Sequence, residues 1–310
     1  MEHEISKEKS LAISLVRILA TVAIVLCHYL QAYHDKWAWV LNVGVQVFLV
    51  LSGYLYGHKE VSHWGKWFFN RFVKLYVPLY IFSTIVLLLI KYCTTTPVGI
   101  MNFIKTGGVD GLGHLWFMKA ITLCYIITPI LQFLRRYSNI VFSFIVFVAI
   151  FEYCYLQESL FMFSWIFLYS IGYFFPTIHQ YYQRIVQMLM AIIIVVLTIY
   201  ISWPDIHNYD GVYNRAWHDM MGIFICLCVI PIFELFKMQK LPSLLKWIDN
   251  NSFYLYLSHY TFLLGPLSLI TIIHNKCLAI LLSFLCMIVC TIMLGRITRY
   301  FSLQLNKILK

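Results

Sequence analysis

The stretch LAISLVRILATVAIVLCHYL, residues 11–30, is apolar except for Arg17 and His28. A helix of about 20 apolar residues is long enough to cross the hydrocarbon core of a bilayer. Arg17 and His28 stand eleven positions apart. At about 100° per residue this is close to three full turns, so both side chains lie on nearly one helix face, roughly 16 Å apart along the axis. The stretch therefore predicts a membrane helix with a charged and a titratable group on the same face.

The composition of the whole chain supports this prediction. Of its 310 residues, 61% are hydrophobic and only 12% are charged, whereas a soluble domain carries roughly 25% charged residues. The apolar runs are continuous, unlike the alternating segments of about ten residues that form a membrane β-barrel. We therefore expect an all-α fold, a polytopic transmembrane helical bundle.

Ten apolar runs are long enough to span a bilayer, and polar connections separate them. We find no internal repeat and no soluble segment, so we expect residues 1–310 to form a single transmembrane domain. The runs cover residues 9–30, 39–57, 72–92, 113–134, 138–156, 160–177, 185–203, 217–236, 251–273 and 277–299.

The distribution of charge predicts the orientation of these spans. Ten spans place both termini on the same side of the membrane. If that side is the cytoplasm, most of the 23 basic residues fall in cytoplasmic segments, as the positive-inside rule requires. We therefore expect both termini to be cytoplasmic. Topology also explains the net charge of +10 better than a nucleic-acid partner does.

Two interpretations of Arg17 and His28 stay open from the residues alone. In the first, His28 is a base in the outward half of the span, because histidine is suited to take a proton from a hydroxyl near neutral pH. Polar groups in membrane helices usually face a bundle interior and serve function. In the second, His28 lies at the interface and Arg17 extends to the inner headgroups.

The second span contains GVQVFLVLSGY, residues 44–54, with Ser52 and Gly53 in mid-run. Small residues let membrane helices approach closely, so the motif is compatible with a packing notch. Gly53 is also compatible with a break in the helix that lets a ligand approach the backbone.

A basic loop precedes the third span. Arg71 and Lys74 are three residues apart and are therefore neighbours on a helix surface. They are suited to neutralise a phosphate-bearing cosubstrate that arrives from the cytoplasm. The alternative is ordinary headgroup anchoring, with Trp64 and Trp67 as interface aromatics.

Polar and aromatic residues also open the fourth and ninth spans. His114 and Trp116 open the fourth, where they suit an acceptor site, although an aromatic belt explains the tryptophan equally well. In the ninth, Ser252, Tyr256 and His259 fall on one helix face. Such a polar stripe needs partners inside the bundle, and these residues are suited to form hydrogen bonds with a neighbouring helix. The histidines lack the spacing of metal ligands, so we expect no metal.

The order of these motifs resembles that of the membrane acyltransferase-3 family, the bacterial integral-membrane O-acyltransferases of surface polysaccharides. Arg–x10–His, the Ser-Gly of the second span, a basic Arg–x–x–Lys, HLWFM and NSFYLYLSH follow one another over roughly residues 10–300. Lys74 replaces the second arginine of the family's basic motif. Gln46 stands where family members commonly have an acidic residue.

The resemblance implies an O-acetyltransferase in the bacterial cytoplasmic membrane. It moves an acetyl group from cytoplasmic acetyl-CoA to a hydroxyl of a cell-surface polysaccharide or its lipid-linked precursor. The partners implied are membrane lipid, acyl-CoA and the glycan, and we expect the bundle, an oligomer or a polysaccharide-assembly partner to present the acceptor. The implied roles are catalytic for His28 (base or acyl carrier) and Arg17, donor-binding for Arg71, Lys74, Ser52 and Gly53, and acceptor-binding for His114, Trp116, Tyr256 and His259.

Other functions remain open beside this one. The same fold is compatible with transfer of succinyl or another acyl group. A glycan or lipid-intermediate exporter would use His28 as a proton relay. The lack of a visible internal repeat, which many transporters have, disfavours this function. A non-catalytic assembly protein of a polysaccharide synthase is the third alternative.

Overall fold

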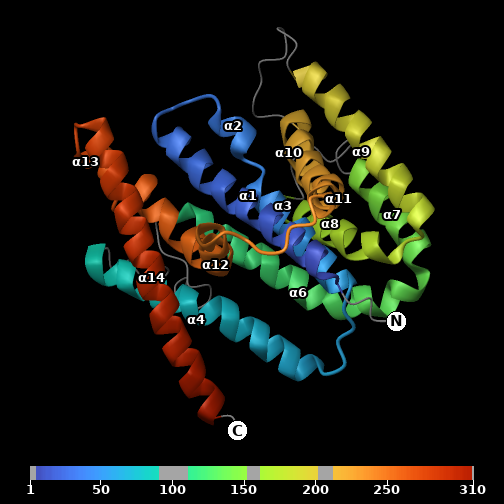
Figure 1. Cartoon of the computed structure of the whole chain (residues 1–310), viewed down its shortest axis with the longest axis horizontal. Helices are drawn as coiled ribbons and strands as arrows, with labels where there is room; N and C mark the ends of the chain where they lie inside the picture. Colours follow the sequence, from blue (N-terminus) through green and yellow to red (C-terminus); the bar gives the residue numbers. More distant parts are fainter. Residues whose placement is uncertain (1–4, 91–110, 152–160, 202–211, 309–310) are drawn as a thin grey trace. The chain divides into compact units, whose positions relative to one another are not determined.

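A computed structural model describes residues 5–90, 111–151, 161–201 and 212–308. These residues form helices and no strand, which confirms the all-α prediction. Helix covers most of the described part of each of the ten predicted runs (Figure 1), although residues 42–43 and 264–268 lie between helices. Residues 91–92, 152–156, 160 and 202–203 of the runs lie outside the described residues. The α-helices are α1 (Lys7–Ala32), α2 (Ala38–Leu41), α3 (Gly44–Gly57), α4 (Trp64–Ile90), α6 (Trp116–Leu134), α7 (Ser138–Phe151), α8 (Phe161–Phe174), α9 (Gln180–Ile201), α10 (Val212–Phe224), α11 (Ile230–Leu235), α12 (Ser243–Leu263), α13 (Leu269–Ile272) and α14 (Lys276–Ile308).

Seven helical stretches of the described chain are long and apolar enough to cross a membrane. One of them, Gly113–Val148, covers the fourth predicted run and residues 138–148 of the fifth. The count of ten spans and the cytoplasmic termini stay predictions. The seven stretches are Lys7–Ala32, Ala38–Gly57, Trp64–Leu88, Gly113–Val148, Gln180–Tyr200, Arg215–Leu235 and Lys276–Gln304.

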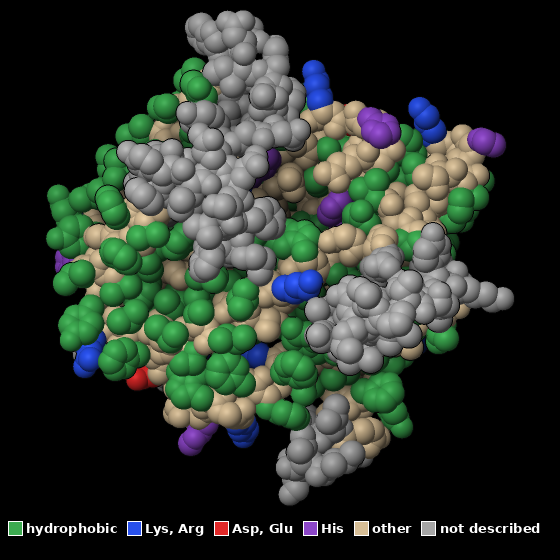
Figure 2. All heavy atoms as spheres, turned by 180° about the vertical axis from the view of Figure 1, so that it is seen from behind, with side chains coloured by type: hydrophobic (Ala, Val, Ile, Leu, Met, Phe, Trp, Pro, Cys, Tyr) green, Lys and Arg blue, Asp and Glu red, His purple; other side chains and the backbone are tan. Residues whose placement is uncertain are grey.

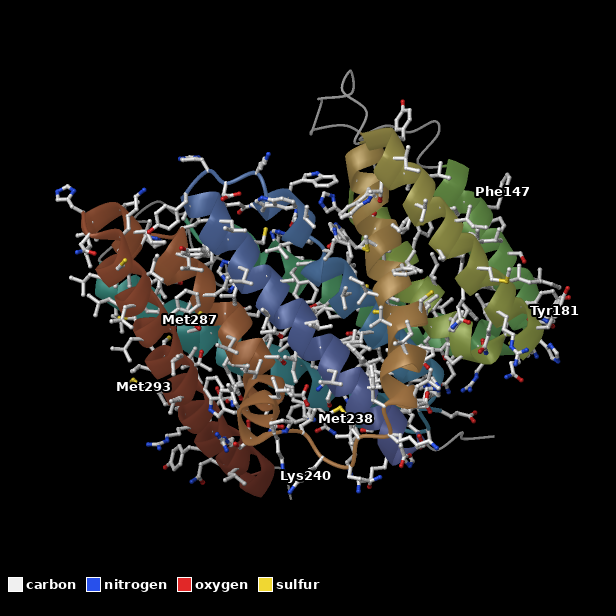
Figure 3. All side chains as sticks on the ribbon, turned by 45° about the horizontal axis from the view of Figure 1, so that its top comes forward. Phe147, Tyr181, Met238, Lys240, Met287 and Met293 are labelled. Atoms are coloured by element: carbon white, nitrogen blue, oxygen red, sulfur yellow. The ribbon has the colours of Figure 1, made fainter. Side chains whose placement is uncertain are left out.

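The outer surface is suited to lipid. On the face shown in Figure 2, hydrophobic side chains cover most of the described surface and few acidic side chains are visible. Phe147 of α7 and Tyr181 of α9 are exposed and point away from the neighbouring helices (Figure 3). A soluble protein would rarely expose so much contiguous apolar surface.

The chain forms two compact units. The first comprises Met1–Ala23, Asn42–Ser62 and Ala120–Leu245, and the second comprises Ile24–Leu41, His63–Lys119 and Lys246–Lys310. Helix α1 contributes residues 7–23 to the first unit and residues 24–32 to the second. The single transmembrane domain stays a prediction.

In the first unit, α3 lies against α8, and α10 lies against α3 and α9. The contact between α3 and α8 depends on a reciprocal pair of glycines. A Cβ on Gly53 would overlap the backbone carbonyl oxygen of Tyr169, and a Cβ on Gly172 would overlap that of Val50. The SGY sequence of the second span therefore forms a packing notch, as one of its two interpretations predicted.

A π-helical turn, Ile225–Val229, separates α10 from α11. Pro231 follows in the first turn of α11, and proline has no N–H to donate to the carbonyl four residues before it. That carbonyl belongs to Leu227, and it accepts a hydrogen bond of 2.7 Å from Gln187 Nε2 of α9. The side chain of Gln187 thus supplies a donor to a backbone carbonyl whose i+4 partner is a proline.

Replacing Gln187 with Leu is expected to lower the free energy of unfolding by about 1–3 kcal/mol, because the buried Leu227 carbonyl would lose its donor. Thermal denaturation of the purified protein in detergent measures the change. Met188→Leu, at an exposed position of the same helix, is the control and should leave the melting temperature unchanged. Equal stability of the Gln187→Leu variant and the wild type would show that the carbonyl needs no donor.

In the second unit, α14 lies against α4 and α13, and α12 joins α14 through apolar and polar contacts. The core contains Val25, Leu255, Leu263 and Met287, and Ser258 Oγ of α12 lies 3.0 Å from Thr291 Oγ1 of α14. Met293 of α14 is exposed, unlike the buried Met287 (Figure 3). Helix α12 is therefore fixed from both its apolar and its polar sides.

Candidate active site

The polar stripe of α12 forms one side of a buried cluster in the second unit. Three residues of the sequence YLYLSHY, Tyr256, His259 and Tyr260, contribute rings to this cluster. His259 has no exposed surface, and Tyr256 is 5% exposed. Buried polar groups of a membrane helix need partners inside the protein, and these residues find them on α1 and near the start of α6.

His28, near the end of α1, is bound to this stripe. Its Nδ1 lies 2.9 Å from Nε2 of His259 and 3.1 Å from the backbone oxygen of Ile24, one turn earlier in its own helix. Its ring also meets the ring of Tyr260 edge-on, with centroids 5.2 Å apart. The first interpretation of His28, a side chain that faces the protein interior, is the one this geometry supports.

His114 completes the cluster from the short helix Gly113–Leu115, which precedes α6. Its Nε2 donates a hydrogen bond of 3.2 Å to the backbone oxygen of Leu257. In return, the hydroxyl of Tyr256 donates to the backbone oxygen of His114. The predicted residues His28, His114, Tyr256 and His259 are thus brought together, and Trp116 follows directly as the first residue of α6.

Tyr260 also belongs to this cluster, although it was not among the predicted site residues. Its ring stacks on that of His114, with centroids 4.8 Å apart and an interplanar angle of 21°. The signal was present in the sequence, because Tyr260 follows Tyr256 by four residues and therefore shares its helix face.

The accessible part of the cluster is His28 together with Tyr260. Both are only partly buried, whereas His114 and His259 are buried. Among the described residues, no hydrogen-bonding partner is found for Nε2 of His28. A partly exposed imidazole that is fixed through one nitrogen can exchange a proton through the other.

Arg71 and Lys74 lie on α4, also in the second unit. The guanidinium of Arg71 lies over the ring of Trp67, 6.0 Å from its centroid, and Lys74 is exposed. Neighbours at i and i+3 present their charges on one helix surface. Arg71 and Lys74 therefore lie on one side of α4.

The remaining predicted residues belong to the first unit. Arg17 is a partly buried position of α1, between the buried Val16 and Ile18. Ser52 is a partly buried position of α3, next to the packing notch at Gly53. Over the described ranges of both units, no group of three His, Cys, Asp or Glu side chains is arranged to hold a metal ion.

Comparison with protein families settles what kind of protein carries this cluster. A family model described as an acyltransferase domain matches residues 10–297. The chain belongs to the acyltransferase-3 family. This confirms the resemblance that the order of the motifs indicated. No curated protein and no solved structure matches the chain.

Family membership gives the residues their chemical setting. With seven helical stretches in its described part that are long and apolar enough to cross a membrane, this member of the acyltransferase-3 family is a multi-pass membrane acyltransferase. Acyl transfer to a hydroxyl needs a base for the hydroxyl proton, and the partly exposed His28 is suited to that role. The assignments of individual site residues stay predictions.

Proposed function

We propose that this acyltransferase moves an acetyl group from cytoplasmic acetyl-CoA to a hydroxyl of a cell-surface polysaccharide or its lipid-linked precursor, in a bacterial cytoplasmic membrane. The observation that carries the proposal is the partly buried His28 imidazole, which is fixed through Nδ1 and has no hydrogen-bonding partner at Nε2 among the described residues. A base in this state is suited to a weakly acidic sugar hydroxyl.

In the proposed reaction, His28 Nε2 takes the proton of the hydroxyl as its oxygen attacks the carbonyl carbon of the thioester. The new C–O bond forms, and the C–S bond to CoA breaks. The proton then passes from His28 to the departing CoA sulfur. The products are the sugar ester and CoA with a free thiol, so one histidine serves as base and then as acid.

The other predicted residues take supporting roles in this proposal. Arg71 and Lys74 hold phosphate groups of the CoA donor, for which guanidinium and ammonium groups are both suited. For Arg17 and Ser52 we propose roles with the acyl donor, as the family resemblance implies. Trp116 offers an aromatic ring for the acceptor sugar.

Replacing Arg71 with Ala is expected to raise the KM for acetyl-CoA roughly tenfold, since one charge-assisted hydrogen bond to phosphate is worth about 1.5 kcal/mol. Lys74→Ala should have a smaller effect, because an ammonium group lacks the planar fork of arginine. Initial rates at varied acetyl-CoA concentration measure both.

Lys66→Ala is the matched control for these two variants. Lys66 is an exposed cation of the same helix, about 140° around the axis from Arg71. Its KM should equal that of the wild type. Equal KM values for all four proteins would remove the two cations from donor binding.

A deletion strain separates the proposed function from its alternatives. Without this protein, the surface glycan should remain at the cell surface but lose its O-acetyl groups, as mass spectrometry of the isolated glycan would show. Loss of succinyl or another acyl group instead would identify a different donor. Glycan that keeps its esters but fails to reach the surface would overturn the proposal in favour of export.

A further inference from the structure

We infer that His259 is a positioning residue for His28: a fully buried imidazole that accepts the Nδ1–H of His28 and thereby directs Nε2 of His28 to the acceptor hydroxyl. The inference rests on the proposed function for its catalytic meaning. It also replaces the acceptor-binding role that the sequence suggested for His259, because a side chain without exposed surface offers no atom to a sugar.

The tautomer of His259 follows from its own helix. Its Nδ1 lies 2.7 Å from the backbone oxygen of Tyr256 and 3.2 Å from that of Leu255. A carbonyl oxygen only accepts hydrogen bonds, so Nδ1 of His259 must carry the proton. In the neutral ring, Nε2 is then a lone pair, and it faces His28.

His28 is fixed as the same tautomer, with the proton on Nδ1, by a separate backbone carbonyl. Its Nδ1 lies 3.1 Å from the backbone oxygen of Ile24, so this nitrogen too must carry the proton. The His28 Nδ1–H therefore donates to Nε2 of His259 at 2.9 Å. If Nε2 of His259 instead donated to Nδ1 of His28, the Nδ1 atoms of both rings would carry lone pairs, and each lone pair would face a backbone carbonyl oxygen of its own helix.

The consequence is a directed chain from His28 to His259 to the backbone of α12. The Nδ1–H bond persists when His28 takes a second proton on Nε2, so the charged ring keeps its orientation and its acceptor. A base that is oriented by a hydrogen bond on its second nitrogen is the arrangement of a catalytic triad. Here a neutral imidazole takes the place of the usual carboxylate.

The surrounding contacts hold His259 in place. His114 Nε2 donates to the backbone oxygen of Leu257, and the hydroxyl of Tyr256 donates to the backbone of His114. These two bonds tie the segment around His114 to the turn of α12 that carries His259. The lone pair offered to His28 is therefore held by a rigid support, as precise sites require.

The first test is kinetic and uses two replacements of His259. Leu removes the acceptor, and we expect kcat to fall about 10²-fold with little change in either KM, because the bond orients the base without touching substrate. Gln places an amide oxygen near the position of Nε2 and should restore kcat to within about tenfold of the wild type. In a His28→Ala background, His259→Leu should cause no further loss.

Ser258→Ala is the matched control for this comparison. Ser258 is the neighbouring residue, is equally buried, and forms its hydrogen bond with Thr291 of α14. We expect its kcat to stay within about twofold of the wild type. A Ser258→Ala loss as large as that of His259→Leu, or a His259→Gln variant no better than His259→Leu, would overturn the inference in favour of a general role in packing.

The second test does not depend on acyl transfer. In protein labelled with ¹⁵N-histidine and reconstituted in lipid, ring-nitrogen shifts distinguish Nδ1–H from Nε2–H tautomers, and loss of signals in His28→Ala and His259→Gln assigns them. We expect both residues to be Nδ1–H tautomers at mildly alkaline pH. An Nε2–H tautomer of His259 would overturn the inference, even in an active enzyme. Failure of the proposed function alone would leave both tautomers as expected in a protein inactive with acetyl-CoA.

Discussion

The His28→Ala variant is expected to insert into the membrane normally and to lose acyl transfer, with kcat lowered by about 10³-fold or more. General-base catalysis contributes roughly 10²–10⁴-fold, and alanine also removes the only partner that Nε2 of His259 has among the described residues. The KM for acetyl-CoA should change little, because His28 acts on the acceptor hydroxyl. Rates of CoA release by purified protein measure both constants.

His34→Asn provides the matched control. His34 follows α1, is exposed, and has a φ of 56°, a left-handed conformation that asparagine tolerates better than most residues. This variant removes a histidine near the end of the same helix without touching the cluster, so it should keep wild-type kcat. A His28→Ala enzyme with the kcat of the His34→Asn control would remove His28 from the mechanism.

Substitution of Gly53 or Gly172 is expected to have the largest effect on stability. A Cβ at either position would overlap a backbone carbonyl of the opposite helix, and backbone cannot rotate out of the way as a side chain can. Separating α3 from α8 would also remove packing around the buried Tyr169 and Tyr173. We expect Gly172→Ala to cost about 3 kcal/mol or more, at the upper end for an overpacked site.

Gly65→Ala is the control for that experiment. Gly65 lies in the first turn of α4, and apart from its chain neighbours and the backbone of its own helix, nothing lies within 4 Å of where its Cβ would stand. Alanine is a better helix former than glycine, so this variant should be as stable as the wild type or slightly more so. Thermal denaturation in detergent compares the proteins, and a Gly172→Ala melting temperature equal to that of Gly65→Ala would contradict the close contact of α3 and α8.

Much of the fold could be predicted from hydropathy because each apolar run had to form its own backbone hydrogen bonds in lipid. The run 217–236 shows the limit. It is continuous in hydropathy, yet the structure divides it into α10, a π-helical turn and α11. Pro231 marked the position of a missing donor, but the side chain that replaces it, Gln187, comes from another helix.

The candidate site was predictable to the extent that it depends on helix periodicity. Spacing placed Tyr256 and His259 on one face, and it also placed Tyr260 there, although we did not single that residue out. Spacing could not show that His28 binds His259, because 231 residues separate them. The role of His259 therefore became visible only from the carbonyl oxygens around its ring.

The motif at Ser52 and Gly53 illustrates the same limit. Small residues in mid-span indicated a close approach, but the sequence left both a neighbouring helix and a ligand open as what approaches. In the structure, the backbone of Tyr169 in α8 is what approaches Gly53. A donor-binding role for Ser52 and Gly53 stays a prediction.

The most direct test of the central claim is transfer of a labelled acetyl group by the purified protein. Wild type and His28→Ala are reconstituted in lipid and incubated with radiolabelled acetyl-CoA and the glycan of the producing cell. We predict that the wild type forms one alkali-labile glycan ester for each CoA thiol released, and that His28→Ala forms almost none. Equal ester formation by both proteins would contradict the account.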